Sequence, residues 1–431
     1  MITKKILSGA LAAVMILSLC ACGNSDERAG SSAGSSSSVS EISQEPAESS
    51  KPESSRPESS SQASSKPRVT SEISYAPLPD ADTSVITDYD KKYFVKRLDH
   101  DQLYYFTEIY KAATQYKNKV RFDRPIEDSK LNALMFLLNY DCPELIHLTG
   151  DYYPEYTDET MYMVSGLKFS YCLSQKEYAS DLKQLEDYFA ELEKKLSGKT
   201  DTEKERYIYD LIFDNCQYNE QNKLSGSVYG VLIKHIGRCE GFCKTIMWTM
   251  RRLSVECLCI SGQQSWSETA IYSEHSWNLI KLDGEWYNLD ITVDNIKSPG
   301  KYDNPPCYGF YNVTDSFVSQ SRDINQIYID LGIPQCTSDK LNYHIQNGLL
   351  LKSGSAGEEE IDKLLEKHFT ENGIDDLSIK FESENDYNNA VTNIDTWINN
   401  FMQNHSGDDF EHKLYYNSLS DTIAVKIYKK S

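Results

Sequence analysis

The sequence is poor in positive charge, and after its first residues it contains no long hydrophobic run. Its 431 residues include 44 Lys and Arg against 65 Asp and Glu, a formal net charge of -21. Nucleic-acid binding depends on clustered basic side chains that neutralise phosphates, so this balance argues against a nucleic-acid partner. It also argues against electrostatic docking on anionic lipid. Calcium loops of the DxDxDG type are missing, and we expect neither a metal nor another cofactor.

The first residues combine positive charge with a short apolar run. Lys4 and Lys5 precede an apolar stretch at residues 6–19, which is too short to span a bilayer and is typical of a secretory signal peptide. The segment LCACG that follows resembles the lipobox of bacterial lipoproteins. This resemblance implies removal of residues 1–21 and lipidation of Cys22, because bulky Leu19 makes Cys20 the weaker candidate. We therefore expect a lipid anchor on the extracellular face of a bacterial membrane, with ordinary signal cleavage as the alternative.

Residues 22–70 are dominated by Ser, Glu and Pro. Such a composition offers too little apolar surface to offset the entropy of ordering the chain. We expect a disordered tether between the membrane and the globular part of the protein.

From residue 71 the composition becomes globular. Residues 71–199 read as a mostly helical region with some strand, and residues 346–431 read as a small α+β domain. Between them, residues 200–345 contain the informative motifs. The sequence TEKE at residues 202–205 has the form of a capping box and predicts a helix that ends near residues 215–216. The expected fold class is α+β.

Cys239 lies where a loop is predicted to turn into a buried helix. Gly237 and Gly241 flank it, and apolar residues follow at helical spacing from Phe242 to Leu253. The first amide groups of a helix lack internal partners, and the helix dipole favours negative charge there. Both effects stabilise a thiolate, the nucleophilic form of cysteine.

A predicted hairpin brings a histidine and an aspartate to one face. Asp283-Gly284 is a strong signal for a two-residue turn. In that register Trp277 lies opposite Asp290, and His275 is the diagonal neighbour of Asp290, within reach of a side-chain hydrogen bond. A four-residue loop would keep this arrangement, whereas a three-residue loop would reverse the faces. The carboxylate can then orient an imidazole that accepts the thiol proton.

The motifs GRCEGF around Cys239, HSWN around His275 and LDGEWYNLDITVDN around Asp290 resemble the transglutaminase-like superfamily in its bacterial branch. The resemblance covers residues 200–296. It implies a papain-like core in which a helix carrying Cys239 packs on an antiparallel sheet carrying His275 and Asp290. It also implies that these residues act as nucleophile, general base and orienting carboxylate. One departure is Asp290-Ile-Thr292, where the family often has Asp-Pro-Thr or Asp-Ala-Thr.

The expected function is that of a membrane-anchored extracellular cysteine enzyme. It would act on peptide or carboxamide bonds of a protein or peptide substrate, including cell-wall-associated ones, through a thioester. Hydrolysis is favoured over cross-linking, because water needs no second binding site. The alternative is a non-catalytic surface binding module that retains the fold.

Several residues near Cys239, His275 and Asp290 have more than one possible role. Tyr229 and Trp277 are candidates for oxyanion binding or support, although packing explains Tyr229 equally well. Asp294 could compete with Asp290 for His275. A thiolate metal site that uses Cys239 and Cys243 has the wrong spacing for structural zinc, and no specific disulfide is predicted.

Overall fold

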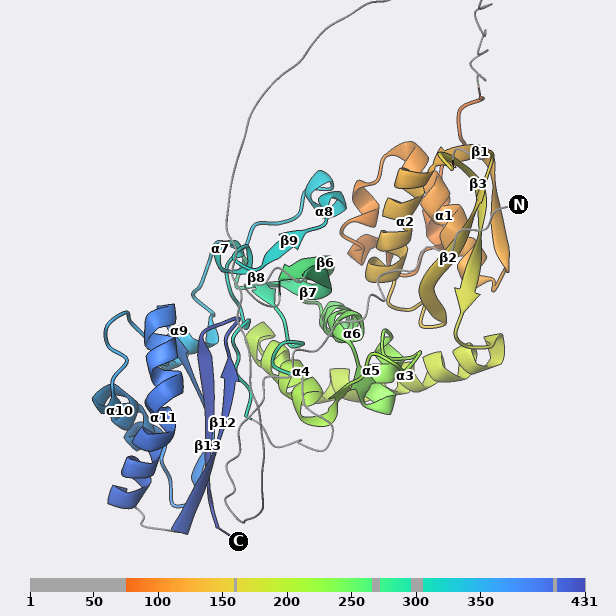
Figure 1. Ribbon diagram of the computed structural model, residues 1–431. Helices are drawn as coiled ribbons and strands as arrows, with labels where there is room; N and C mark the ends of the chain where they lie inside the picture. Colours follow the sequence, from red (N-terminus) through yellow and green to blue (C-terminus); the bar gives the residue numbers. More distant parts are fainter. Residues whose placement is uncertain (1–74, 159–160, 266–271, 296–304, 406–408, 431) are drawn as a thin grey trace, which may run out of the picture. The chain divides into compact units, whose positions relative to one another are not determined.

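The computed structural model describes residues 75–158, 161–265, 272–295, 305–405 and 409–430 (Figure 1). The predictions for the signal peptide, for Cys22 and for the tether lie outside these residues. From Pro77 onward, the described residues belong to one compact unit. Within the described ranges, no helix combines the length and the apolar character that a membrane span requires.

The first part of this unit combines helices with a small antiparallel sheet. Three short 3-10 helices come first, at Thr83–Val85, Tyr89–Lys91 and Val95–Arg97. The longer elements are α1 (His100–Thr114), β1 (Lys119–Glu127), α2 (Asp128–Asp141), β2 (Leu148–Tyr156), β3 (Met163–Tyr171) and α3 (Gln175–Lys195), and the strands are ordered β1-β3-β2. The region was predicted to be mostly helical with some strand, and it contains three strands of nine residues beside its helices.

Helix α4 (Asp201–Asn215) has its capping box two residues before the predicted one. Thr200 is the N-cap, and its side chain and that of Glu203 satisfy each other's backbone amides. The prediction at residues 202–205 was therefore wrong, because the same Thr-x-x-Glu spacing occurs two residues earlier. Glu205 is instead buried and accepts a hydrogen bond of 3.0 Å from Asn312 Nδ2. The predicted helix end is confirmed.

A four-stranded antiparallel sheet forms the centre of the next region, with the order β8-β7-β6-β9. Its strands are β6 (Cys257–Ser265), β7 (Tyr272–Leu282), β8 (Glu285–Leu289) and β9 (Arg322–Ile324). The region also contains β4 (Gln217–Tyr218), α5 (Val228–Lys234), β5 (Ile236–Gly237), α6 (Cys239–Arg252), α7 (Asp315–Val318), α8 (Gln326–Asp330) and α9 (Tyr343–Asn347).

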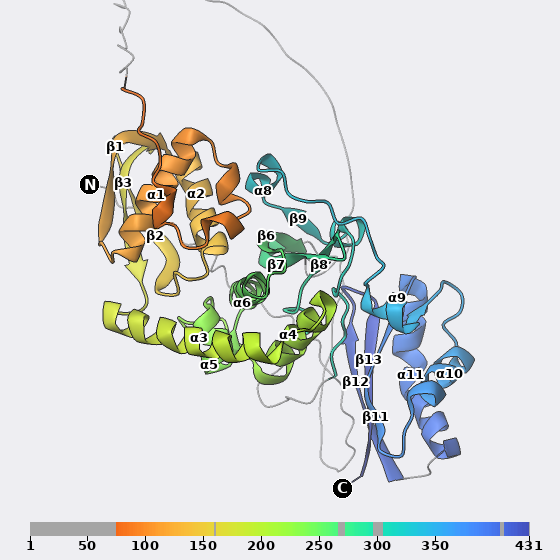
Figure 2. The ribbon, with the colours of Figure 1, turned by 180° about the vertical axis from the view of Figure 1, so that it is seen from behind.

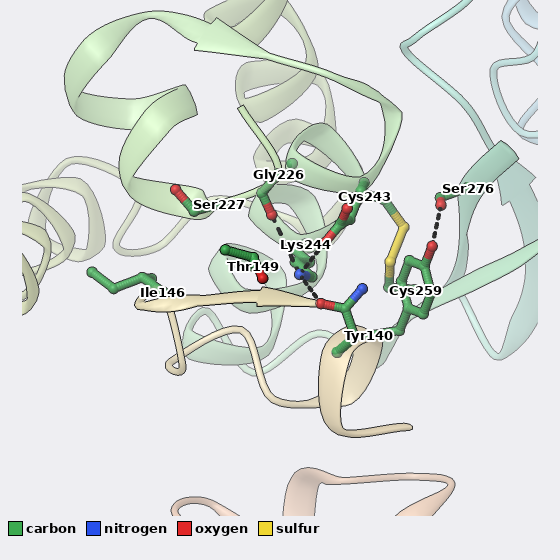
Figure 3. Close-up of polar contacts among 12 residues, drawn as sticks. Tyr140, Ile146, Thr149, Gly226, Ser227, Cys243, Lys244, Cys259 and Ser276 are labelled. Carbon is green, nitrogen blue, oxygen red and sulfur yellow. Dashed lines mark hydrogen bonds and ion pairs between the residues drawn. A yellow bond between two sulfur atoms is a disulfide. The ribbon is translucent and has the colours of Figure 1, made fainter. Parts of the chain in front are cut away.

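Helix α6 is buried along nearly its whole length and packs on β6 and β7 (Figure 1). Asn278 on β7 donates a hydrogen bond of 2.9 Å to the carbonyl oxygen of Cys243. A disulfide between Cys243 and Cys259 joins α6 to β6, with the two Cα atoms 5.6 Å apart (Figure 3). No specific disulfide was predicted, because this pairing depends on how the helix packs on the sheet.

Residues at the end of helix α2 form hydrogen bonds with both α6 and β7, the elements that carry Cys239 and His275 (Figure 3). Lys244 on α6 donates to Asn139 Oδ1 at 2.8 Å and to the carbonyl oxygen of Gly226 at 3.3 Å. On β7, Ser276 Oγ donates to the hydroxyl of Tyr140 at 3.3 Å. At the far end of α6, Arg251 forms a buried ion pair of 2.7 Å with Asp141. The N-terminal region therefore packs directly on the helix and strand that carry the candidate residues.

The last region, which was predicted to be a small α+β domain, contains both helices and a sheet. Its elements are β10 (Leu350–Leu351), α10 (Glu358–His368), β11 (Gly373–Phe381), α11 (Glu384–His405), β12 (Phe410–Asn417) and β13 (Thr422–Lys429). The sheet order is β10-β11-β13-β12, and both helices cover one face of it (Figures 1 and 2). The sequence did not predict β12, because its residues FEHKLYYN lack a clean alternation of apolar and polar side chains. The α+β fold class is confirmed.

Candidate active site

Cys239 is the first residue of α6 and is partly exposed, with its sulfur outside the disulfide. Arg238 precedes it in extended conformation, with φ -124° and ψ 175°. Gly241 is required in the first turn, because a Cβ atom there would lie 2.0 Å from the carbonyl oxygen of Ser225. The leading amide groups of α6 have no acceptor within the helix, and the helix dipole adds partial positive charge. The sulfur therefore lies at the start of a buried helix, which is the position that the sequence predicted for it.

His275 lies on β7 and is 2% exposed. Its Nε2 donates to Asp290 Oδ2 at 2.7 Å. Burial alone would lower the pKa of His275, but the charge of Asp290 and the side-chain hydrogen bonds to Asp290 and Cys239 raise it above its ordinary value. Because Asp290 occupies Nε2, Nδ1 is the ring nitrogen that remains to interact with the thiol. The imidazole is thus shared between a carboxylate and a sulfur.

Asp290 follows β8 directly, where the predicted hairpin places it. The strands pair Leu282 with Glu285 and Asn278 with Leu289, which is the register expected from a two-residue turn. Asp290 Oδ1 accepts a hydrogen bond of 2.8 Å from the backbone N–H of Thr292. Although burial opposes it, the charges of His275 and Arg322 and these hydrogen bonds hold the pKa of Asp290 well below its ordinary value. The departure at Asp290-Ile-Thr292 therefore leaves the carboxylate oriented.

Arg322 on β9 is a site residue that the sequence analysis missed. Its Nη2 donates to Asp290 Oδ2 at 2.7 Å, and its side chain is fully buried. The position is 32 residues beyond Asp290 and becomes adjacent only because Gln264 on β6 pairs with Arg322 on β9. A three-residue edge strand has no periodicity that reveals its partner, so no sequence signal could have identified this contact.

Of the two predicted supporting residues, Trp277 lies beside His275 and Tyr229 contacts a different helix. Trp277 lies in the site: its indole donates to Asn288 Oδ1 at 3.0 Å, and its ring is nearly parallel to that of His275, with centroids 6.1 Å apart. Tyr229 is buried on α5, and its hydroxyl donates to Gln184 on α3 at 3.3 Å, so the structure does not bring it to Cys239. A role for Tyr229 in oxyanion binding has no support in this geometry.

Asp294 does not compete for His275. Tyr209 on α4 donates a hydrogen bond to Asp294 Oδ2, and both side chains are buried. Burial is the main cause that raises the pKa of Asp294 to about 7. Asp290 is therefore the carboxylate that serves the imidazole.

The residues beside Cys239 add positive charge. Glu240 lies between Arg238 Nη2 at 2.7 Å and Lys244 Nζ at 2.5 Å. Burial opposes ionisation of Glu240, but these two cations lower its pKa to about 2. One anion between two cations leaves this group of three side chains with a net positive charge beside Cys239. In the described part of the chain, no group of three or more His, Cys, Asp or Glu side chains is arranged to hold a metal.

Residues 190–291 match the family model described as the transglutaminase-like superfamily. The chain carries a transglutaminase-like domain. Two solved structures are similar to part of this chain. One is a candidate cysteine protease from Cytophaga hutchinsonii, with 22% identity over 25% of this chain and a TM-score of 0.21. The other is a TGase, with 12% identity over 40% of this chain and a TM-score of 0.23. These alignments span 37% and 50% of the two solved chains. No curated protein matches the chain.

The transglutaminase-like domain therefore unites a partly exposed thiol at a helix start, a buried imidazole and a buried carboxylate. Nucleophile, base and orienting group in hydrogen-bonded series are what covalent acyl transfer requires. These features support the interpretation of the protein as a cysteine enzyme.

Proposed function

We propose that the protein is a cysteine acyl-transfer enzyme that hydrolyses peptide or carboxamide bonds. The single observation that carries the proposal is the buried hydrogen bond of 2.7 Å from His275 Nε2 to Asp290 Oδ2, on an imidazole whose pKa is also raised by its hydrogen bond with Cys239. The leading amide groups of α6 support it, because they can also bind the oxygen that becomes negative when the sulfur attacks a carbonyl.

The reaction proceeds in two halves. The thiolate of Cys239 attacks the carbonyl carbon, a carbon–sulfur bond forms, and the carbonyl electrons move to oxygen. When the tetrahedral intermediate collapses, the carbon–nitrogen bond breaks, and the imidazolium of His275 gives its proton to the departing amine. A water molecule then attacks the thioester while His275 accepts its proton. Cleavage of the carbon–sulfur bond releases the carboxylic acid and restores the thiolate–imidazolium pair.

The acceptor in the second half distinguishes hydrolysis from cross-linking. The same three residues serve both outcomes, and we favour water because it needs no dedicated binding site. The proposal places this enzyme on the extracellular face of the membrane, held through a lipid on Cys22 and the tether of residues 22–70, with proteins or peptides as substrates. The acidic composition of the chain supports partners other than nucleic acid.

The test is to trap the acyl-enzyme with peptide libraries and the full-length protein, with mass spectrometry of the peptide that contains Cys239. The wild type should gain the mass of an acyl fragment and release free acid, and Cys239→Ala should gain none. Cys172→Ala is the matched control, because Cys172 is another partly exposed cysteine outside the disulfide. Added lysine-like amine should leave the acid as the main product. If no acyl adduct forms at Cys239 with any library, the chain is a binding module and the proposal is wrong.

A further inference from the structure

Arg322 occupies an unusual environment for a cation. Its guanidinium carbon lies 4.2 Å from the ring centroid of Phe310 and 5.0 Å from that of Trp277. Among the described residues, Nη2 is the only one of its three nitrogen atoms with a hydrogen-bond partner, which is Asp290 Oδ2; Nε and Nη1 have none there. Two aromatic faces therefore take the place of further acceptors. A fully buried arginine with one polar partner is costly, so its single contact deserves a functional explanation.

The carboxylate oxygen that Arg322 binds is the one that accepts from His275. Both donors lie 2.7 Å from Asp290 Oδ2, whereas Oδ1 accepts from the backbone of Thr292. The carboxylate is consequently fixed from three directions. If Cys239 and His275 form a thiolate–imidazolium pair, then Asp290 without Arg322 would leave one net negative charge in the interior. With Arg322 the buried set is neutral.

We propose that Arg322 is a positioning residue of this site: through Asp290 Oδ2 it holds the carboxylate toward His275 and supplies the positive charge that favours loss of a proton from the Cys239–His275 pair. This inference rests on the proposed function for its meaning in catalysis. It concerns a residue outside the part of the chain that matches the transglutaminase-like family, which ends at residue 291.

The electrostatic consequence has a definite sign. A fixed positive charge makes each proton loss from its neighbours easier, so its removal should move both proton losses of the Cys239–His275 pair to higher pH. Other charged or titratable groups act on the site from the surrounding elements and are unchanged by a substitution at Arg322. These groups are Arg238, Glu240, Glu274, Asp294, Tyr140, Tyr209 and Tyr218.

The experiment compares Arg322→Met with Arg322→Lys in the full-length protein. The readout is the rate at which iodoacetamide alkylates Cys239, measured across pH by mass spectrometry of the peptide that contains it. Arg251→Met is the matched control, because Arg251 is also buried in a 2.7 Å ion pair with an aspartate but follows Cys239 by about 18 Å along the axis of α6. Thermal unfolding shows which variants fold.

In Arg322→Met, we expect the pH at which the alkylation rate of Cys239 increases to be higher by about one unit. Arg322→Lys should return the rise toward the wild-type position, and Arg251→Met should lose stability without moving it. If both Arg322 variants fold and the rise stays at the wild-type pH, or if Arg251→Met moves it equally, the inference is wrong. Alkylation needs no substrate, so the two ideas can fail separately. A shift in the pH dependence together with no acyl-enzyme would support the role of Arg322 and overturn only the proposed function.

Discussion

Substitution of Asp290 by Asn tests the site most deeply, because it affects catalysis and stability through different contacts. The amide keeps the shape of the carboxylate but removes the charge that His275 and Arg322 share. With its oxygen held by the Thr292 N–H, the amide turns its donating nitrogen toward His275 Nε2 and Arg322. His275 then loses the acceptor of its Nε2 hydrogen bond, and Arg322 becomes an uncompensated buried cation. The two losses can be separated.

The catalytic loss should be large. When the orienting carboxylate of a catalytic triad becomes an amide, the imidazole adopts the wrong tautomer and turnover falls by roughly 10⁴-fold. The stability loss should be about 3–5 kcal/mol, the range for removal of one partner from a buried ion pair. The contact supports the upper part of that range, because Asp290 and Arg322 are both essentially without solvent exposure.

The double variant Asp290→Asn with Arg322→Met separates the two effects. Removal of both partners leaves no buried charge, so the free energy of unfolding should recover by more than half relative to Asp290→Asn alone. Turnover should not recover. The assays are denaturant unfolding followed by tryptophan fluorescence, and hydrolysis of the peptide found by acyl-enzyme trapping. If the double variant is less stable than Asp290→Asn, the buried pair is not what the aspartate stabilises, and this reasoning is refuted.

Three further substitutions test separate parts of the structure. Replacement of Cys243 and Cys259 by Ala should lower the free energy of unfolding by about 3 kcal/mol, because their disulfide closes a loop with a sequence separation of 16; equal denaturation midpoints for variant and oxidised wild type would contradict this. Burial raises the pKa of Glu205 from 4.5 to about 8, so its stabilising effect is complete below pH 4.5 and is lost as the pH rises through 8. Glu205→Gln keeps an acceptor for Asn312 and should therefore stabilise the protein by roughly 3 kcal/mol at pH 7 and by much less at pH 4.5. Thermal unfolding that shows the same gain in stability at both pH values would be inconsistent with a buried, titrating Glu205. Tyr229→Phe should leave alkylation of Cys239 unchanged, because the hydroxyl contacts α3, and a change of more than twofold would return Tyr229 to the site.

Local patterns were enough to predict the hairpin and the helix start that position the site. Asp283 and Gly284 both adopt positive φ, at 50° and 85°, which is what a two-residue turn of this kind requires. Once the turn was fixed, strand alternation determined that His275 and Asp290 share a face. The predicted placement of Cys239 depended on two flanking glycines and a helical apolar pattern, which are also local signals.

The features that the sequence did not reveal depend on packing between distant elements. Arg322 reaches Asp290 only because β9 pairs with β6, and the pairing of a three-residue strand leaves no pattern in the sequence. The disulfide likewise depends on the packing of α6 against β6. For Glu205, the Thr-x-x-Glu spacing suggested a cap, but burial against Asn312 determined its role. Spacing rules describe single elements and hairpins, whereas these contacts are set by the tertiary fold.

The most direct test of the account is the reactivity of Cys239 toward iodoacetamide at neutral pH in the native full-length protein, compared with His275→Ala and with Cys172 as the internal reference. A thiol paired with an imidazole at a helix start should react much faster than Cys172, whose pKa is raised by burial, and should lose most of that advantage in His275→Ala. A rate for Cys239 that is no higher than that of Cys172 and is unchanged in His275→Ala would contradict the account.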